Sequence, residues 1–208
     1  MKRSLSSYNL MNMKPGKKLK IADANMQKIL GDVSPAGIWL IYGREKNGKT
    51  WFSLQMAKLL SKTGKTAYVS AEEGFGDSFR AVCRRACITS ADRIAWYGYL
   101  SIDELIDKFG KSKAPRIIFI DNLTVYMGEL KPSEVKNRLA ASLPKSLLIF
   151  VAHEERKEPY PSIAKQAKRW ANVVFHVEGL KAIVTSRFST GGEIVIDESK
   201  GELYWGKN

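Results

Sequence analysis

The fold of this chain is decided by one stretch of its sequence, Gly43-Arg-Glu-Lys-Asn-Gly48-Lys49-Thr50. An apolar run, residues 37–42, precedes it, and residues 50–60 place apolar side chains at helical spacing after it. A strand, a loop and a helix in this order direct the N–H groups of the loop into one concavity, which the helix dipole makes positive. The stretch fits G-x-x-x-x-G-K-[ST] in full and therefore predicts a loop that binds phosphate groups.

The chemistry of the loop follows from its last three residues. Gly48 lets the backbone approach a phosphate closely, Lys49 is expected to reach the β- and γ-phosphates, and the Thr50 hydroxyl is expected to ligate magnesium. Mg-ATP is therefore the predicted ligand. The residues expected to contact the nucleotide are Gly43, Arg44, Glu45, Lys46, Asn47, Gly48, Lys49, Thr50 and Trp51.

Acidic residues follow two other apolar runs. Asp121 follows Ile117-Ile-Phe-Ile120, so we expect its carboxylate at the carboxyl edge of a sheet, holding magnesium directly or through water. Glu72, which with Glu73 follows residues 66–70, is the candidate for activating the attacking water. The alternative interpretations are a turn-forming aspartate and an exposed acidic turn.

Apolar strands alternate with amphipathic helices through most of the chain. The predicted strands are residues 37–42, 66–70, 94–99, 116–121 and 147–151, and the predicted helices are residues 50–60, 79–87, 102–109 (opened by Ser101) and 132–141. This alternation predicts an α/β fold, a three-layer αβα domain with a mainly parallel sheet. Residues 172–177, 180–188 and 193–196, joined by tight turns, predict antiparallel strands at the C-terminal end.

The charge of the chain bears on its partner. Its 208 residues include 34 lysines and arginines against 21 acids, a net charge of +13, which favours encounters with polyanions such as nucleic acid over a merely solvated basic surface. Residues 1–25 predict a flexible basic arm, with Pro15-Gly16 breaking any helix, and residues 26–208 predict the ATPase domain.

Other sequence features exclude several classes of protein. The apolar runs are too short to cross a bilayer, and no apolar stretch follows Met1-Lys-Arg3 as a signal peptide requires, so we expect a cytoplasmic protein without a membrane partner. Cys83 and Cys87 lie four residues apart in a predicted helix without nearby histidines, so a reduced pair is expected rather than a zinc site. Trp170 is expected to pack into the core.

These motifs resemble the RecA superfamily, the core shared by RecA recombinases, bacterial RadA and DnaB-type hexameric helicases. Four pieces arrive in the order of the family: the loop at residues 43–50, then Tyr68-Val-Ser-Ala-Glu-Glu73, Ile117-Ile-Phe-Ile-Asp121 and Leu148-Ile-Phe-Val-Ala-His153. The local similarity is greatest to RadA, whose Lys-Asn-Arg-Phe-Gly segment is similar to residues 182–189 here. The resemblance covers about residues 28–205.

The resemblance implies a role for each matching residue. Glu72 would activate water, His153 would sense the γ-phosphate, and Arg187 would reach the nucleotide of an adjacent subunit. The loops after Asp121 and His153 would face a nucleic-acid strand. Thr185 and Ser189 stand where the family has a lysine and a glycine. Without the resemblance, His153 is equally well a structural hydrogen bonder, and Arg187 a surface charge.

The sequence thus predicts a RecA-like ATPase that binds and hydrolyses Mg-ATP and works as a homo-oligomer, ring or filament, on single-stranded DNA. DNA-stimulated ATP hydrolysis in recombination, annealing or replication is the expected activity. The alternatives are a minimal hexameric helicase of plasmid or phage type, a small-molecule kinase, and a regulatory ATP-binding protein without DNA binding.

Overall fold

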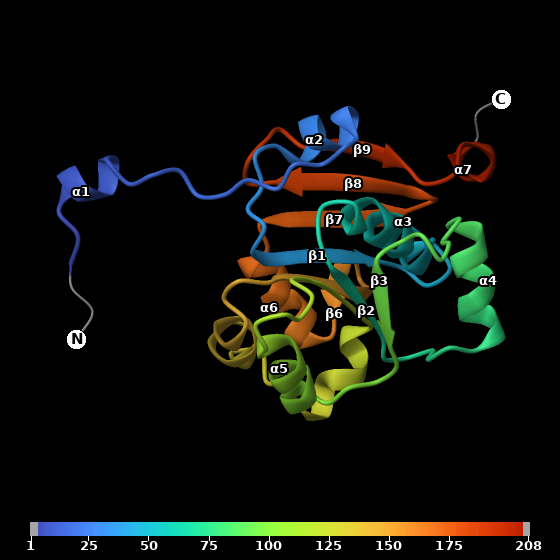
Figure 1. The fold of residues 1–208 in the computed structure, drawn as a ribbon. Helices are drawn as coiled ribbons and strands as arrows, with labels where there is room; N and C mark the ends of the chain where they lie inside the picture. Colours follow the sequence, from blue (N-terminus) through green and yellow to red (C-terminus); the bar gives the residue numbers. More distant parts are fainter. Residues whose placement is uncertain (1–3, 206–208) are drawn as a thin grey trace.

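A computed structural model describes residues 4–205, so Lys2 and Arg3 of the predicted basic arm, and residues 206–208 of the predicted domain, lie outside it. The described chain forms a nine-stranded sheet in the order β3-β2-β4-β5-β1-β7-β8-β9, with β6 paired to β5 (Figure 1). The parallel strands are β1 (Gly37–Gly43), β2 (Thr66–Ser70), β3 (Ile94–Tyr97), β4 (Ile117–Asp121), β5 (Leu147–Glu155) and β7 (Val173–Glu178). Antiparallel strands are β6 (Glu158–Tyr160), β8 (Lys181–Ser186) and β9 (Gly192–Val195).

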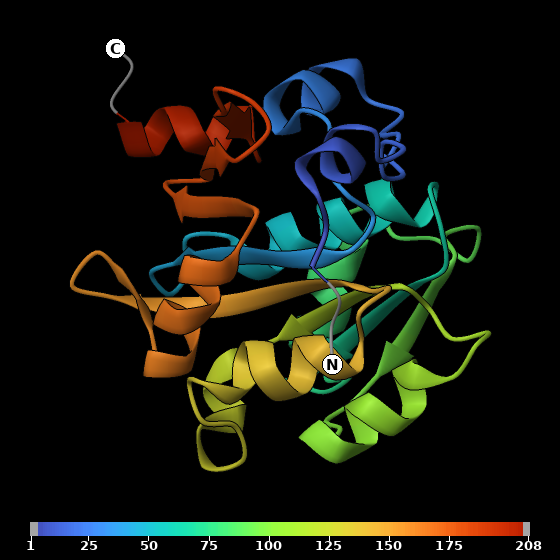
Figure 2. The ribbon, with the colours of Figure 1, turned by 90° about the vertical axis from the view of Figure 1, so that its left-hand side faces the viewer.

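Helices cover both faces of this sheet (Figure 2). On one face lie α2 (Ala24–Leu30), α3 (Lys49–Ser61) and α4 (Asp77–Arg85); on the other lie α5 (Ile102–Gly110), η1 (Leu123–Gly128), η2 (Val135–Ala140) and α6 (Ser162–Trp170). Strand β1 shows why both faces are covered: Trp39 and Ile41 enter the first core, and Ile38 and Leu40 enter the second. Because side chains alternate along a strand, an unbroken apolar run supplies two cores. The predicted three-layer αβα fold with antiparallel C-terminal strands is confirmed.

Three local predictions need correction. The helix predicted at residues 132–141 begins later, at Val135, because Lys131–Glu134 form a turn in which the Glu134 N–H donates to the Lys131 carbonyl. Leu180 lies in a two-residue turn rather than in a strand, because Glu178 pairs with Lys181. Trp170 ends α6 and is 40% exposed, with the Lys136 ammonium 3.5 Å from the centre of its ring, so it is not a core residue.

The N-terminal segment has two parts. The helix α1 (Ser7–Met11) lies away from the body of the molecule (Figure 1). Further along, Leu19 and Ile21 are buried, and the Leu19 N–H donates to the Val33 carbonyl. Asp23 then caps α2 by accepting from the Met26 N–H. Residues 19–23 therefore pack on the domain, while the boundary at residue 25 stays a prediction.

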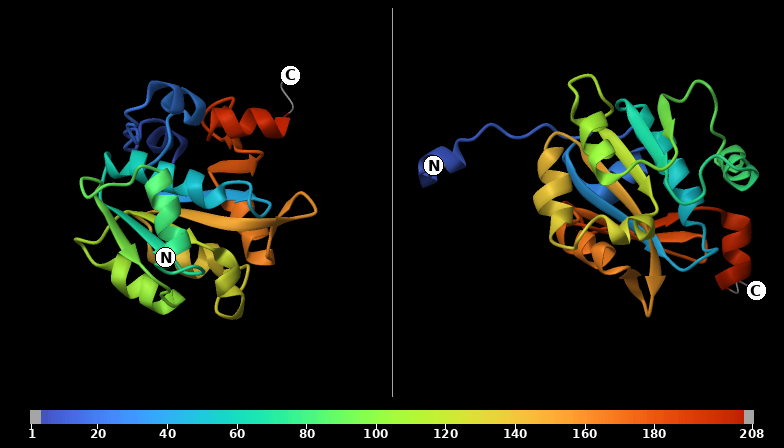
Figure 3. Two further views of the ribbon diagram at one scale, coloured as in Figure 1. Left: turned by 90° about the vertical axis from the view of Figure 1, so that its right-hand side faces the viewer. Right: turned by 90° about the horizontal axis from the view of Figure 1, so that it is seen from below.

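The parallel strands set the position of the site. Their carboxyl ends meet at the edge seen in Figure 3, left, where β1 leads into α3 and where Ser70, Asp121 and His153 lie at or near strand ends. Within residues 4–205, none of the helices is long and apolar enough to span a membrane.

Candidate functional site

The loop between β1 and α3 has the backbone shape of a phosphate site. Lys46 and Gly48 both have positive φ, at 60° and 94°, so the chain folds back on itself between Gly43 and the first turn of α3. A Cβ at residue 48 would lie 2.6 Å from Leu180 Cδ2, so only glycine fits in this conformation. Consecutive N–H groups in such a loop, at the start of a 13-residue helix, form an anion-binding concavity.

Lys49 supplies the charge at the base of this concavity. Its side chain is buried, and its Nζ donates to the Arg44 carbonyl at 2.8 Å, which holds the ammonium within the loop. Burial lowers the pKa of Lys49, whereas the carboxylates of Asp121 and Glu45 oppose that change. A buried cation bonded only to a neutral carbonyl is well placed to exchange that bond for a charge-assisted one to phosphate.

Asp121 is tied to the helix that carries Lys49 and Thr50. The Tyr68 hydroxyl donates to Asp121 Oδ2 at 2.7 Å and lies 2.6 Å from Ser53 Oγ, while the Ser53 hydroxyl donates to the Thr50 carbonyl at 2.9 Å. Tyr68 is fully buried, stacked on Phe119. Because one tyrosine hydroxyl joins β4 to α3, it fixes Asp121 relative to Thr50.

The environment of Asp121 favours a bound cation. Its pKa is raised to about 6, chiefly by burial and also by the carboxylates of Glu72 and Glu73, while the Tyr68 hydrogen bond and the Lys49 charge act to lower it. A buried carboxylate among acids is stabilised in its charged form by a divalent cation. The described residues contain no group of three acids, histidines or cysteines able to hold a metal alone. Magnesium, which uses one or two protein oxygens together with phosphate and water, fits the Thr50 hydroxyl and Asp121 carboxylate.

Glu72 and His153 meet beside the phosphate loop. Asn122 Nδ2 donates to Glu72 Oε2 at 2.9 Å, and His153 Nε2 lies 3.6 Å from the same oxygen. The His153 Nδ1 atom is buried without a hydrogen-bond partner in the described part of the chain. The structure thus brings together the two residues predicted to activate water and to sense phosphate. Asn122, which orients Glu72, was not predicted from the sequence.

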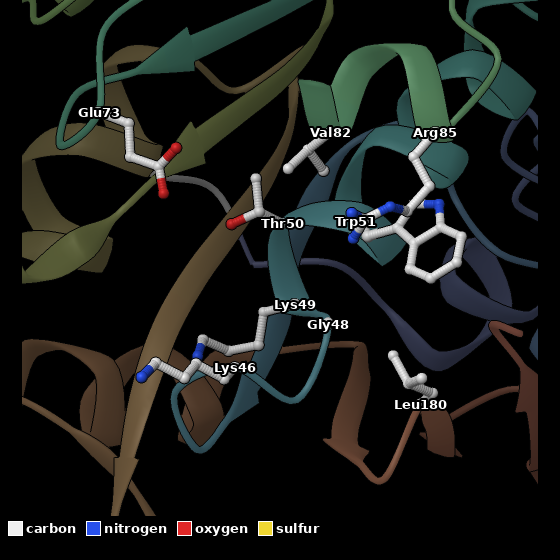
Figure 4. A pocket seen from close by; sticks show the side chains of 9 residues that line it. All are labelled: Lys46, Gly48, Lys49, Thr50, Trp51, Glu73, Val82, Arg85 and Leu180. Atoms are coloured by element: carbon white, nitrogen blue, oxygen red, sulfur yellow. The ribbon is translucent and has the colours of Figure 1, made fainter. Parts of the chain in front are cut away.

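The hollow above the phosphate loop contains groups of two kinds (Figure 4). It has a volume of about 450 Å³, with Lys46, Lys49 and Thr50 on one side and Trp51, Arg85 and Leu180 on the other. The Arg85 guanidinium lies 5.2 Å from the centre of the Trp51 ring. A polar, cationic side next to an apolar and aromatic side suits a ligand with phosphates at one end and a flat base at the other.

Glu73 rather than Glu72 lines this hollow. Glu72 is turned toward Asn122 and His153, as its contacts show. Both carboxylates are exposed and follow β2. The sequence placed the pair correctly at the carboxyl edge, and the choice between them for activating water stays a prediction.

A turn from the far end of the chain rests on the phosphate loop. Gly179 and Leu180, with φ of 51° and 59°, connect β7 to β8. The Gly179 N–H donates to Asn47 Oδ1 at 2.9 Å, and Leu180 packs over Gly48. The interaction of Asn47 is therefore with protein, and Leu180 enters the hollow without any signal in the local sequence.

Other predicted contacts lie outside the hollow. Arg44 pairs with Glu154, with 3.5 Å between Nε and Oε1, and the other Glu154 oxygen lies 2.7 Å from His176 Nε2. Glu45 is an exposed residue of the loop. Arg187 donates to the Arg169 carbonyl and lines a separate hollow of about 460 Å³ with Tyr42. Within one chain, the structure does not bring Arg187 to the phosphate loop.

Comparisons with known proteins agree with the fold. No family model matches the chain, and no curated protein matches its sequence. Among solved structures, the chain is similar to the ATPase domain of a helicase, with a TM-score of 0.53 and 16% sequence identity. The match covers 76% of this chain and 78% of that one. The chain therefore has a RecA-like α/β fold.

Proposed function

We infer that this chain is an ATPase that binds Mg-ATP and hydrolyses it at the carboxyl edge of its sheet. The observation that carries the inference is the convergence of four groups there: the buried ammonium of Lys49, the carboxylate of Asp121 tied to the helix of Thr50, and the Glu72–His153 pair. Phosphoryl transfer needs positioning and neutralisation of charge, together with one group that orients the nucleophile.

Each group has a distinct task in this proposal. Lys49 and the N–H groups of the loop bind the β- and γ-phosphates, and Thr50 and Asp121 hold magnesium, which neutralises phosphate charge. Glu72, oriented by Asn122, accepts a proton from the attacking water. His153, in contact with Glu72, responds to the γ-phosphate and transmits its presence to the hairpin formed by β5 and β6.

We extend the proposal to an oligomer acting on single-stranded DNA in the cytoplasm. Arg187 is exposed and lies away from the phosphate loop of its own chain, an arrangement that suits action on the nucleotide of a neighbour. The turn between β5 and β6 presents Arg156 and Lys157, both exposed, next to the exposed ring of Tyr160. Cations and an aromatic ring are the groups that bind phosphate and stack on a base. The local similarity to RadA belongs to this proposal, and a minimal helicase shares every one of these features.

The test is ATP turnover measured with and without single-stranded DNA, for the wild type and for Glu72→Gln and Glu73→Gln. We expect DNA to stimulate the wild type, and Glu72→Gln to lose turnover on the order of 100-fold, while the neighbouring Glu73→Gln keeps most of it. Loss in Glu73→Gln alone would move the water-activating role to Glu73. Absence of stimulation by DNA would favour a regulatory ATP-binding protein, and phosphate transfer to a small molecule would favour a kinase.

The role of Arg187 needs a mixing experiment. Arg187→Ala subunits are titrated into Lys49→Ala subunits, so that each variant is inactive alone. We expect mixed oligomers to regain turnover, because an intact arginine then faces an intact phosphate loop. Full turnover by Arg187→Ala alone would remove its role.

A further inference from the structure

The edge at which the parallel strands begin is made of four segments with one sign of charge: residues 14–22, 61–66, 111–117 and 142–147. Together they contain ten lysines and arginines and no aspartate or glutamate. Residues 61–66 lead into β2, residues 111–117 into β4, and residues 142–147 into β5. Figure 2 looks onto this edge, with the N-terminal segment crossing in front of it. We name these four segments the amino-end face.

The segments form one continuous surface. A hollow of about 350 Å³ is lined by Leu19 from the first, Lys65 from the second, and Lys113 and Arg116 from the third. A second hollow of about 380 Å³ shares Arg116 and adds Lys145 from the fourth. The Lys65 ammonium also donates to the Lys113 carbonyl. The positive charges thus surround two adjoining depressions.

Most of these charges lack a carboxylate partner. Within residues 4–205, only Lys18 and Lys111 of the ten form ion pairs, with Asp32 and Asp107. Both pairs are exposed and therefore weak. The guanidinium of Arg116 donates to three carbonyl groups, those of Phe109, Lys111 and Ser112, which fix it without neutralising it. Eight positive charges remain uncompensated on a surface a few strands wide.

The opposite edge carries a different balance. There, residues 44–49, 71–77 and 153–158, at the ends of β1, β2 and β5, contain seven acids and five lysines and arginines. A polyanion that approaches the protein is therefore attracted more strongly to the amino-end face, because its charges add within a Debye length of about 8 Å at physiological salt.

We propose that the amino-end face binds the phosphate backbone of nucleic acid, as a second surface separate from the nucleotide end of the molecule. The cations come from consecutive strand starts about 4.8 Å apart, so they form a row suited to a linear polyanion. Lys65 and Lys113 border a hollow, which a phosphodiester strand enters more readily than a flat bilayer does. The four segments contain no aromatic residue, so the face cannot stack on bases. Binding is therefore independent of sequence and similar for single strands and duplexes.

The experiment measures fluorescence anisotropy of labelled single-stranded and duplex oligonucleotides over a series of salt concentrations. The test variant is Lys65→Glu/Lys113→Glu, and the matched control is Arg80→Glu/Arg84→Glu, which makes the same charge change on exposed residues of α4. We expect the test variant to lose affinity on the order of tenfold, with a salt slope lower by roughly 1.4 for single strands, since each lost phosphate contact contributes about 0.7. The control should stay within about twofold.

Several outcomes would overturn the proposal. Equal losses in the two variants would show a general effect of net charge, and unchanged affinity in the test variant would remove the face. Tighter binding of the wild type to phosphatidylserine vesicles than to either oligonucleotide would assign the face to a membrane. The variant Lys65→Gln/Lys113→Gln, with a smaller loss expected, guards against misfolding of the glutamate variant. Since none of these measurements requires ATP, failure of the proposed ATPase activity would leave them interpretable.

Discussion

The two edges of the parallel sheet are built on different physical terms. At the carboxyl edge, the decisive charged groups are few, buried and fixed by hydrogen bonds, as Lys49 is by the Arg44 carbonyl and Asp121 by Tyr68. At the amino edge, charged groups are many and exposed, and few of them are held by contacts. The first arrangement can place a charge on a chosen atom, whereas the second can only attract a charged polymer. The two edges should therefore respond to mutation independently.

The largest effect is expected from Lys49→Ala, which tests this independence directly. Removal of the ammonium should lower ATP turnover by at least about 100-fold, because the phosphates lose their one buried cation. The affinity for an oligonucleotide without ATP should stay within about twofold, since the amino-end face is unchanged. Both quantities can be measured on one preparation. A large loss of DNA affinity would show that the two edges are coupled and break the comparison.

A pH-dependent effect is expected from Asp121. Its pKa of about 6, against the ordinary value of 3.8, means that the folded state holds the proton more tightly than the unfolded state. Without metal, the stability from this group is complete below about pH 4 and is lost as pH rises to about 6, a change of about 3 kcal/mol.

Asp121→Asn should lack this component. Urea unfolding of both proteins in a chelator, from pH 4 to pH 7, measures the difference in their free energies of unfolding. If that difference is constant over this range, Asp121 is not held in a cation-free, buried environment, and the physical contrast between the edges becomes weaker.

A smaller effect is expected from Tyr68→Phe, which removes the hydroxyl that ties Asp121 to α3. The ring packing is kept, so the change should raise the magnesium concentration for half-maximal turnover by about tenfold, equivalent to about 1.4 kcal/mol. Tyr126→Phe is the control, because Tyr126 is also fully buried and its hydroxyl donates only to the Leu100 carbonyl, among the bonds of the described residues. Equal magnesium responses in the two variants would assign Tyr68 to packing alone.

The smallest effect is expected from Asn47→Ala, which removes the bond from the Gly179 N–H to the phosphate loop. Loss of one neutral hydrogen bond should raise KM for ATP by roughly fivefold and leave kcat nearly unchanged. Steady-state kinetics beside Asn137→Ala, an exposed change on η2, would measure this. A fall in kcat at constant KM would show that the turn acts on the chemical step instead.

Much of this molecule was predictable because the decisive signals are local. The loop at residues 43–50 carries its own pattern, and the apolar runs of β1, β2, β4 and β5 are typical of strands buried on both faces. The position of Asp121 follows, because the carboxyl ends of parallel strands share one edge.

The remaining features depend on contacts between distant residues. Leu180 reaches the hollow from a turn near the far end of the chain, and Arg85 reaches Trp51 from the next helix. No periodicity in the sequence reports either contact. Trp170 was misplaced because its apolar ring suggested burial, while its position at the end of α6 exposes it beside Lys136. The amino-end face is scattered over four segments, and only the topology assembles it.

Two hairpin turns of equal length set where a reporter domain can be inserted. Arg156–Lys157 and Gly179–Leu180 are both two-residue turns with positive φ, but the first is exposed and the second lies against Gly48 and, on its other side, Tyr204. A fluorescent protein grafted into the first turn would stand clear of the nucleotide. The same graft in the second would force the phosphate loop open, so a biosensor for ATP occupancy belongs at the second turn and a neutral tag at the first.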